Sequence, residues 1–118
     1  MILVDTSVWI DHFRRGNGRL VGLLESAAVL CHPFVVGELA CGNLGIRATI
    51  LELLRTLPMS AVATDDEVLA FLEARRLMGR GLGYIDVHLL AAAALGSAPL
   101  WSLDRRLASA ARELQLGA

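Results

Sequence analysis

The sequence contains no lysine, and all eleven of its basic residues are arginine. This absence excludes every mechanism that depends on a catalytic lysine. It also excludes a nucleotide-binding phosphate loop at the glycine-rich stretch GRGLGY, residues 79–84, because such a loop requires a lysine. Arginine binds phosphate groups through its planar guanidinium, so the composition permits a nucleic-acid partner without requiring one.

Cysteine is scarce. Cys31 and Cys41 are the two cysteines of the chain, and they lack the spacing of metal ligands. We interpret both as reduced residues of the core rather than as a disulfide.

Long apolar runs are absent as well. The longest stretch without Asp, Glu or Arg extends from Val87 to Leu103, and His88, Gly96 and Pro99 interrupt it, so no membrane segment is expected. No basic residues precede the apolar N-terminal residues, which are therefore not expected to form a signal peptide. Together these features predict a cytoplasmic protein with no membrane contact.

The length of 118 residues fits a single domain, residues 1–118, that buries roughly two-thirds of its unfolded surface. Hydrophobic residues make up 55% of the chain, and the mean hydropathy of +0.56 is high for a small domain. The helices must therefore be apolar on more than one side. We expect a protein partner or a homodimer to cover the apolar surface that a monomer would leave exposed.

Short apolar runs alternate with helical patterns, which predicts an α/β fold with a mainly parallel sheet covered by helices. Strands are expected at residues 2–5, 28–31, 59–62 and 99–103, the third being weak, and an edge strand at residues 116–118 stays open. Helices are expected at residues 6–16, 18–27, 33–42, 46–57, 64–79, 85–95 and 104–115. Thr64 and Glu67 form the pattern of a capping box, which also accounts for Asp65 and Asp66.

Four acidic residues, called the acidic quartet below, occupy places where an acid needs an explanation: Asp5, Glu38, Asp86 and Asp104. Asp5 ends the first apolar run, Asp104 follows the run PLWSL, and Asp86 begins the alanine-rich helix. Glu38 shares a helix face with Phe34, so we expect it to point toward the sheet and away from water.

Each acid also has an ordinary structural explanation. The three aspartates suit helix N-caps, and Glu38 could pair with an arginine. These explanations weaken when taken together, because the carboxyl ends of parallel strands and the following helix N-termini gather at one edge of a sheet, where ligands bind.

Four acids at one edge would repel one another, and helix dipoles would offset only part of that repulsion. A hard divalent cation would remove the conflict, and Mg²⁺ and Mn²⁺ prefer carboxylate and water oxygens. Such a site activates water and stabilises charge on phosphoryl oxygens, which is the chemistry of phosphodiester hydrolysis.

Four segments resemble, in order, the four acidic motifs of PIN-domain ribonucleases: ILVDTSVWIDHF, VVGELACG, IDVHLLAAA and LWSLDRRL. The resemblance is closest to the VapC toxins of bacterial toxin–antitoxin pairs, and it extends from Ile2 to about Leu114. It implies a three-layer α/β/α domain whose parallel sheet brings the quartet into one pocket that binds Mg²⁺ or Mn²⁺.

The resemblance also implies a role for each residue. The aspartates of the quartet would hold metal directly or through water, and Glu38 would hold metal or orient the attacking water as a base. Thr6 and Ser102 match the family's hydroxyl positions and would hydrogen-bond the carboxylates, although threonine is more usual at the position of Ser102.

VapC toxins are endoribonucleases that block translation, form homodimers and are neutralised by a VapB-type antitoxin that fills the toxin's groove. The resemblance therefore implies an RNA substrate, such an antitoxin and a homodimer for this chain. Arg80 and Arg105 are candidates for contacts with RNA phosphates. His88 is expected to pack rather than bind metal, and Trp9 and Trp101 are expected in the core.

Two other functions stay open. A PIN-fold nuclease that acts on DNA or in RNA maturation would have the same site. The second is a non-catalytic PIN-like interaction module, although a family member that has lost its activity should also have lost at least one acid of the quartet. A phosphotransfer domain fits poorly, since its pattern needs a lysine.

Overall fold

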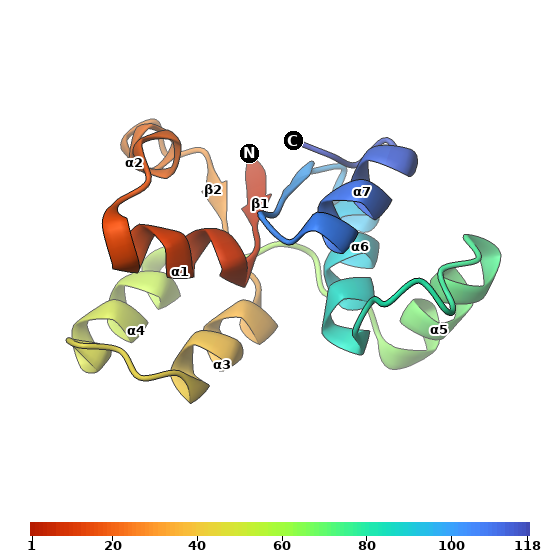
Figure 1. Ribbon diagram of the computed structural model, residues 1–118, viewed down its shortest axis with the longest axis horizontal. Helices are drawn as coiled ribbons and strands as arrows, with labels where there is room; N and C mark the ends of the chain where they lie inside the picture. Colours follow the sequence, from red (N-terminus) through yellow and green to blue (C-terminus); the bar gives the residue numbers. More distant parts are fainter.

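A three-stranded parallel sheet lies at the centre of the computed structural model, which describes residues 1–118 (Figure 1). β1 (Ile2–Val4) is the middle strand, with β2 (Val29–Leu30) on one side and β3 (Leu100–Trp101) on the other. The second strand is therefore added on one side of β1, and the third strand is added on the opposite side. The carboxyl end of β1 is the switch point at which open parallel sheets bind ligands.

Helices cover the sheet on both sides of β1 (Figure 1). They are α1 (Thr6–Arg15), α2 (Gly18–Glu25), α3 (Pro33–Cys41), α4 (Arg47–Thr56), α5 (Asp65–Ala74), α6 (Tyr84–Gly96) and α7 (Arg105–Glu113). The predicted α/β fold with a parallel, helix-covered sheet is confirmed.

The core explains the high hydropathy of the sequence. Leu3 and Val4 of β1 are fully buried, and every residue of α6 from Val87 to Ala93 is buried. A helix that is apolar on all sides must be covered on all sides, and α6 packs against both α5 and β3. No helix combines the length and the apolar character that crossing a membrane would require.

Several expected boundaries differ from the structure. The helix expected over residues 64–79 ends at Ala74, because Arg76 adopts a left-handed conformation with φ 53° and the chain turns. The weak strand at residues 59–62 is reduced to one parallel bridge between Met59 and Cys31. The edge strand left open at residues 116–118 is reduced to a single parallel bridge between Gly117 and Leu100.

Two local predictions have opposite outcomes. The capping box forms, since the Thr64 N–H donates to Glu67 Oε1 at 2.9 Å and the Glu67 N–H donates to Thr64 Oγ1 at 3.1 Å. The placement of both thiols in the core was wrong for one of them. Cys31 is buried, whereas Cys41 is exposed at the last turn of α3, where the helix faces solvent.

Candidate active site

Asp5 lies just past the end of β1 and is only 6% exposed. Its Oδ2 atom accepts hydrogen bonds from Ser7 Oγ at 2.7 Å and from Ser102 Oγ at 2.8 Å, with the Ser7 N–H farther away at 3.4 Å. A buried carboxylate needs such partners. Asp5 is therefore both the N-cap of α1 and a carboxylate fixed by two hydroxyls.

The same two hydroxyls connect the ends of β1 and β3. Ser7 Oγ accepts a hydrogen bond from the Leu103 N–H at 2.9 Å, and Ser102 Oγ accepts one from the Asp104 N–H at 3.0 Å. Asp5 is thus held relative to Asp104. The sequence pattern identified Ser102 but missed Ser7; the available signal was that two hydroxyl residues, not one, follow Asp5.

Asp104 and Asp86 are each held by one backbone hydrogen bond. Asp104 is the N-cap of α7, and its Oδ1 accepts from the Leu107 N–H at 3.0 Å. Asp86 lies in the first turn of α6, where its Oδ2 accepts from the Gly83 N–H at 2.9 Å. Gly83, rather than Asp86, is the N-cap of that helix.

Glu38 differs from its expected environment. It is exposed on α3 instead of pointing into the sheet, because this face of α3 borders an open groove beside α1. Its partner is a hydroxyl and not an arginine: Thr6 Oγ1 donates to Glu38 Oε1 at 2.8 Å. Thr6 thus ties the start of α1 to the middle of α3.

The pKa values of two members of the quartet, Glu38 and Asp86, respond to the charges of the other acids. Although the Glu38 residue as a whole is exposed, partial desolvation of its carboxyl group raises its pKa, and the negative charges of Asp5 and Asp86 raise it further. Burial likewise raises the pKa of Asp86, with added contributions from Asp5 and Asp104. Carboxylates from four different elements therefore act on one another at the edge where β1 ends.

The oxygen atoms of the quartet divide into two sets. In each residue one carboxylate oxygen accepts all of the hydrogen bonds from the protein, and the other accepts none. A set of free, mutually repelling carboxylate oxygens suits a hard cation such as Mg²⁺. No three His, Cys, Asp or Glu side chains lie close enough to hold one ion by themselves, so water would have to complete the coordination.

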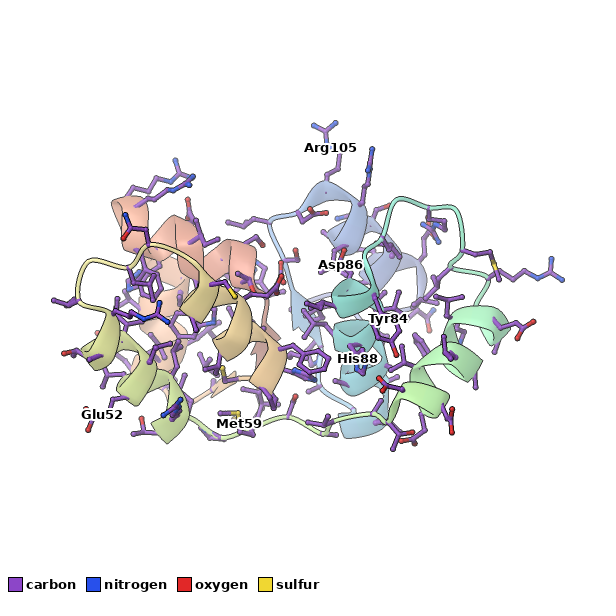
Figure 2. All side chains as sticks on the ribbon, turned by 90° about the horizontal axis from the view of Figure 1, so that it is seen from below. Glu52, Met59, Tyr84, Asp86, His88 and Arg105 are labelled. Carbon is purple, nitrogen blue, oxygen red and sulfur yellow. The ribbon has the colours of Figure 1, made fainter.

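Histidine and tryptophan take the structural positions expected of them. His88 is 2% exposed and packs between the rings of Phe34 and Tyr84, with centroid distances of 4.6 and 4.8 Å. Figure 2 shows Asp86 on the part of α6 nearer α7, with Tyr84 and His88 farther from Arg105. Both tryptophans are buried in the core.

The two arginines considered for RNA binding differ in their surroundings. Arg80 Nη1 forms an ion pair with Glu113 Oε2 at 2.7 Å. Arg105 is exposed at the start of α7, next to Asp104, and forms no ion pair (Figure 2).

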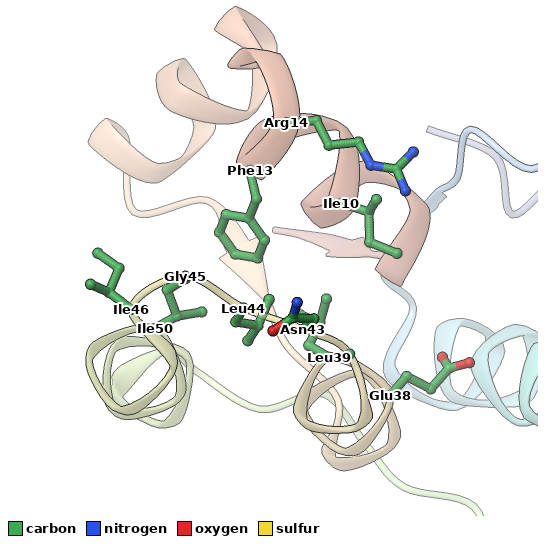
Figure 3. Close-up of a pocket in the computed structure, with 11 residues that line it drawn as sticks. Ile10, Phe13, Arg14, Glu38, Leu39, Asn43, Leu44, Gly45, Ile46 and Ile50 are labelled. Atoms are coloured by element: carbon green, nitrogen blue, oxygen red, sulfur yellow. The ribbon is translucent and has the colours of Figure 1, made fainter.

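A groove of about 490 Å³ between α1, α3 and α4 reaches one member of the quartet, Glu38 (Figure 3). Its walls are mainly apolar and include Ile10, Phe13, Leu39 and Ile46, with Glu38 at one end and Arg14 on the α1 side. A second pocket of about 250 Å³ shares Phe13 with it. The residues that line this groove could not be identified from local sequence patterns, because they come from α1, α3, α4 and the connection between α3 and α4.

The profile of the PIN domain matches residues 2–113, which is nearly the whole chain. The chain belongs to the PIN-domain family. This PIN domain is 51% identical over 114 residues to Ribonuclease VapC32 of Mycobacterium tuberculosis, in strain CDC 1551 / Oshkosh and in strain ATCC 25618 / H37Rv. The match covers 96% of this chain and 92% of each relative, so the predicted kinship with VapC toxins is confirmed.

Two solved structures share the fold. The crystal structure of FitAcB from Neisseria gonorrhoeae has a TM-score of 0.61 and 23% identity, covering 95% of this chain and 94% of that one. The structure of FitAB bound to an IR36 DNA fragment has a TM-score of 0.60 and 21% identity, covering 95% and 91%. At these identities the likeness establishes the fold and nothing finer.

Proposed function

We propose that this PIN domain is a Mg²⁺- or Mn²⁺-dependent endoribonuclease and the toxin of a VapBC-type pair, which blocks translation in the cytoplasm. The acidic quartet is the observation that carries the proposal. Its members come from four elements, the charges of neighbouring members raise the pKa of Glu38 and of Asp86, and each member keeps one oxygen free of protein hydrogen bonds. The kinship with a ribonuclease named VapC32 supports RNA as the substrate.

The proposed roles follow from the contacts of each carboxylate. Asp5, Asp86 and Asp104 would hold a divalent cation, directly or through water. That cation would supply the charge that activates water and stabilises the phosphoryl oxygens. Glu38 would hold the same ion or accept a proton from the attacking water at Oε2, since Oε1 is bound by Thr6; its raised pKa suits a general base.

Cleavage of purified RNA tests the proposal. Total RNA would be incubated with the protein in Mg²⁺, Mn²⁺ or a chelator, beside Asp104→Asn and a matched control, Asp66→Asn, in which the acid lies at the start of α5. We expect discrete metal-dependent cuts, a loss of more than about 100-fold in Asp104→Asn, and full activity in the control. Mn²⁺ binding, followed by electron paramagnetic resonance, should weaken in Asp104→Asn alone.

The alternatives give different results. Metal-dependent cleavage of DNA with intact RNA would identify a PIN-fold nuclease acting on DNA. A folded protein that neither cleaves nor binds Mn²⁺ would refute the metal site and leave an interaction module.

The apolar groove is the proposed site of a VapB-type antitoxin. Ile46 is 67% exposed on its wall, and Phe13 and Ile10 are also exposed, so a partner with apolar side chains would cover them. Ile46→Ser, which adds no charge to the groove, should preserve RNA cleavage and weaken neutralisation by the antitoxin, whereas Leu95→Ser on α6 should affect neither. Neutralisation that is unchanged in Ile46→Ser would place the antitoxin elsewhere.

A homodimer is proposed for the same physical reason. Exposed apolar side chains remain on α3, on α5 and on the connection between α4 and α5: Phe34, Met59, Val62 and Leu69. Analytical ultracentrifugation should report a dimer that Leu69→Arg converts to a monomer. A wild-type monomer at micromolar concentration would contradict the proposal.

Arg105 remains a proposed contact with RNA because it is exposed, unpaired and adjacent to Asp104 in the chain. Arg80 could serve in the same way only if its ion pair with Glu113 opened on binding.

A further inference from the structure

Several arginines of this chain are engaged by other groups of the protein. Arg15 pairs with Asp11 at 2.6 Å, Arg80 pairs with Glu113, and Arg19 lies over the ring of Trp101 at 4.2 Å. Arg14 is different. It is exposed, makes neither an ion pair nor a hydrogen bond, and lines the same groove as Glu38.

The position of Arg14 follows from helical geometry. Thr6, Ile10 and Arg14 are spaced four residues apart on α1, so they form one row along the helix. Thr6 contacts Glu38 at the quartet, and Ile10 lines the groove next along the row. At 1.5 Å per residue, the Cα atoms of Thr6 and Arg14 are about 12 Å apart along the axis.

The direction of the side chain shortens that separation. Side chains on a helix lean toward its N-terminus, which for α1 is the end that carries the quartet. Figure 3 shows the Arg14 side chain extending over Ile10, on the side of the groove where Glu38 lies. An unpaired positive charge therefore lines the same groove as Glu38, one member of the quartet.

We propose that Arg14 binds a backbone phosphate of the RNA next to the cleaved bond and so directs the strand along the groove between α1 and α3. This inference rests on the proposed ribonuclease function. Acidic residues that no cation neutralises repel the phosphates of RNA. An RNA strand that extends away from the quartet therefore needs a positive group along its path. The guanidinium of Arg14 suits a phosphate, which it can bind with two parallel hydrogen bonds.

Arg14 is a positioning residue in this scheme and touches no reacting atom. Arg14→Ala should therefore raise KM about tenfold at low salt and leave kcat nearly unchanged. Arg14→Lys should recover part of the loss, because it restores the charge without the planar fork. An antitoxin seated in the groove would also cover Arg14 and compete with the RNA.

Binding measurements separate this role from a general effect of charge. Fluorescence anisotropy would follow a fluorescein-labelled single-stranded RNA of mixed sequence on Asp104→Asn protein over a series of salt concentrations. Adding Arg14→Ala should weaken binding and lower the slope of log K against log salt by about one. Adding Arg15→Ala, the matched control whose guanidinium is held by Asp11, should leave that slope unchanged.

The outcomes distinguish the inference from the function on which it rests. If the wild type cleaves RNA and Arg14→Ala keeps the parent's KM and salt slope, the role of Arg14 is refuted and the nuclease function stands. Equal losses in the Arg14 and Arg15 variants would also refute it, because they indicate only net charge. Unchanged RNA binding with weaker antitoxin binding would assign Arg14 to the protein partner instead. Failure of the wild type to bind or cleave RNA would refute both proposals.

Discussion

Replacing Ser102 by alanine tests how the protein holds its most buried acid. Ser102 Oγ donates to Asp5 Oδ2 at 2.8 Å and accepts from the Asp104 N–H at 3.0 Å, and the residue is 8% exposed. The substitution removes both bonds at a place where water has little access. It should therefore weaken the fold and also loosen two carboxylates of the quartet.

The magnitude follows from the lost bonds. A hydrogen bond to a charged group contributes about 1.5–3 kcal/mol, and the orphaned Asp104 N–H adds a smaller penalty because Asp104 is exposed. We expect the free energy of unfolding to fall by about 2–3 kcal/mol, which lowers the Tm of a domain of this size by roughly 6–15 °C. Affinity for Mn²⁺ should fall by about 10- to 100-fold, as when groups that orient metal ligands are removed.

Urea unfolding, Mn²⁺ titration and RNA cleavage measure the three effects. Ser102→Thr keeps the hydroxyl and should stay close to wild type, and Ser109→Ala on α7 serves as the control, since the Ser109 hydroxyl makes no hydrogen bond. Ser7 donates to the same Oδ2 atom, so Ser7→Ala combined with Ser102→Ala should destabilise by more than the sum of the single changes. Wild-type stability and Mn²⁺ affinity in Ser102→Ala would refute the role given to these hydroxyls.

Three further predictions concern charge, backbone and thiol. Burial and nearby acids raise the pKa of Asp86, so the folded state binds its proton more tightly than the unfolded state does and loses stability as pH rises through that pKa. In the presence of a chelator, Asp86→Asn should therefore raise the Tm at neutral pH. This gain in Tm should vanish below about pH 4, near the ordinary pKa of aspartate. An unchanged Tm at neutral pH would contradict the prediction. Gly81 has φ +75°, and Gly79 has φ +72°, so alanine at either position would carry the strain of a left-handed conformation. An added Cβ at Gly81 would also lie 2.6 Å from Arg106 Nη1 and 2.9 Å from Arg106 Cδ, so the Arg106 side chain would have to shift, whereas no atom lies within 4 Å at Gly79. In thermal melts Gly81→Ala should therefore lower stability slightly more than Gly79→Ala. Cys41 should react with a thiol reagent in the native protein and the buried thiol only after unfolding; slow labelling of both would show that α3 is covered at its end.

Local patterns were sufficient to locate most helices and the three principal strands. A buried parallel strand reads as a short apolar run, as Ile2–Val4 does, and a capping box such as that of Thr64 is encoded within four residues. The quartet was found by the same logic, since three of its members stand at strand ends or in first helical turns. The predicted end of α5 was wrong. Arg76 ends this helix through a left-handed conformation, which the spacing of apolar residues does not exclude.

Burial of single side chains was predicted less well. Glu38 lies on a helix face with apolar neighbours, yet it is exposed, because a groove opens between that face and α1. Whether a helix face meets the sheet, another helix or solvent depends on how neighbouring helices pack. The spacing of residues along one helix carries no such information.

The sequence alone determined which acids end strands and how many helices separate them, and it predicted that they would meet at one edge of a parallel sheet. Only the tertiary structure decided which oxygen atoms are held and which are free. Ser102 and Asp5 are 97 residues apart, and their contact depends on the register between β1 and β3. Strands of two or three residues are too short for an alternating pattern to specify that register, so the packing of the helices around them fixes it.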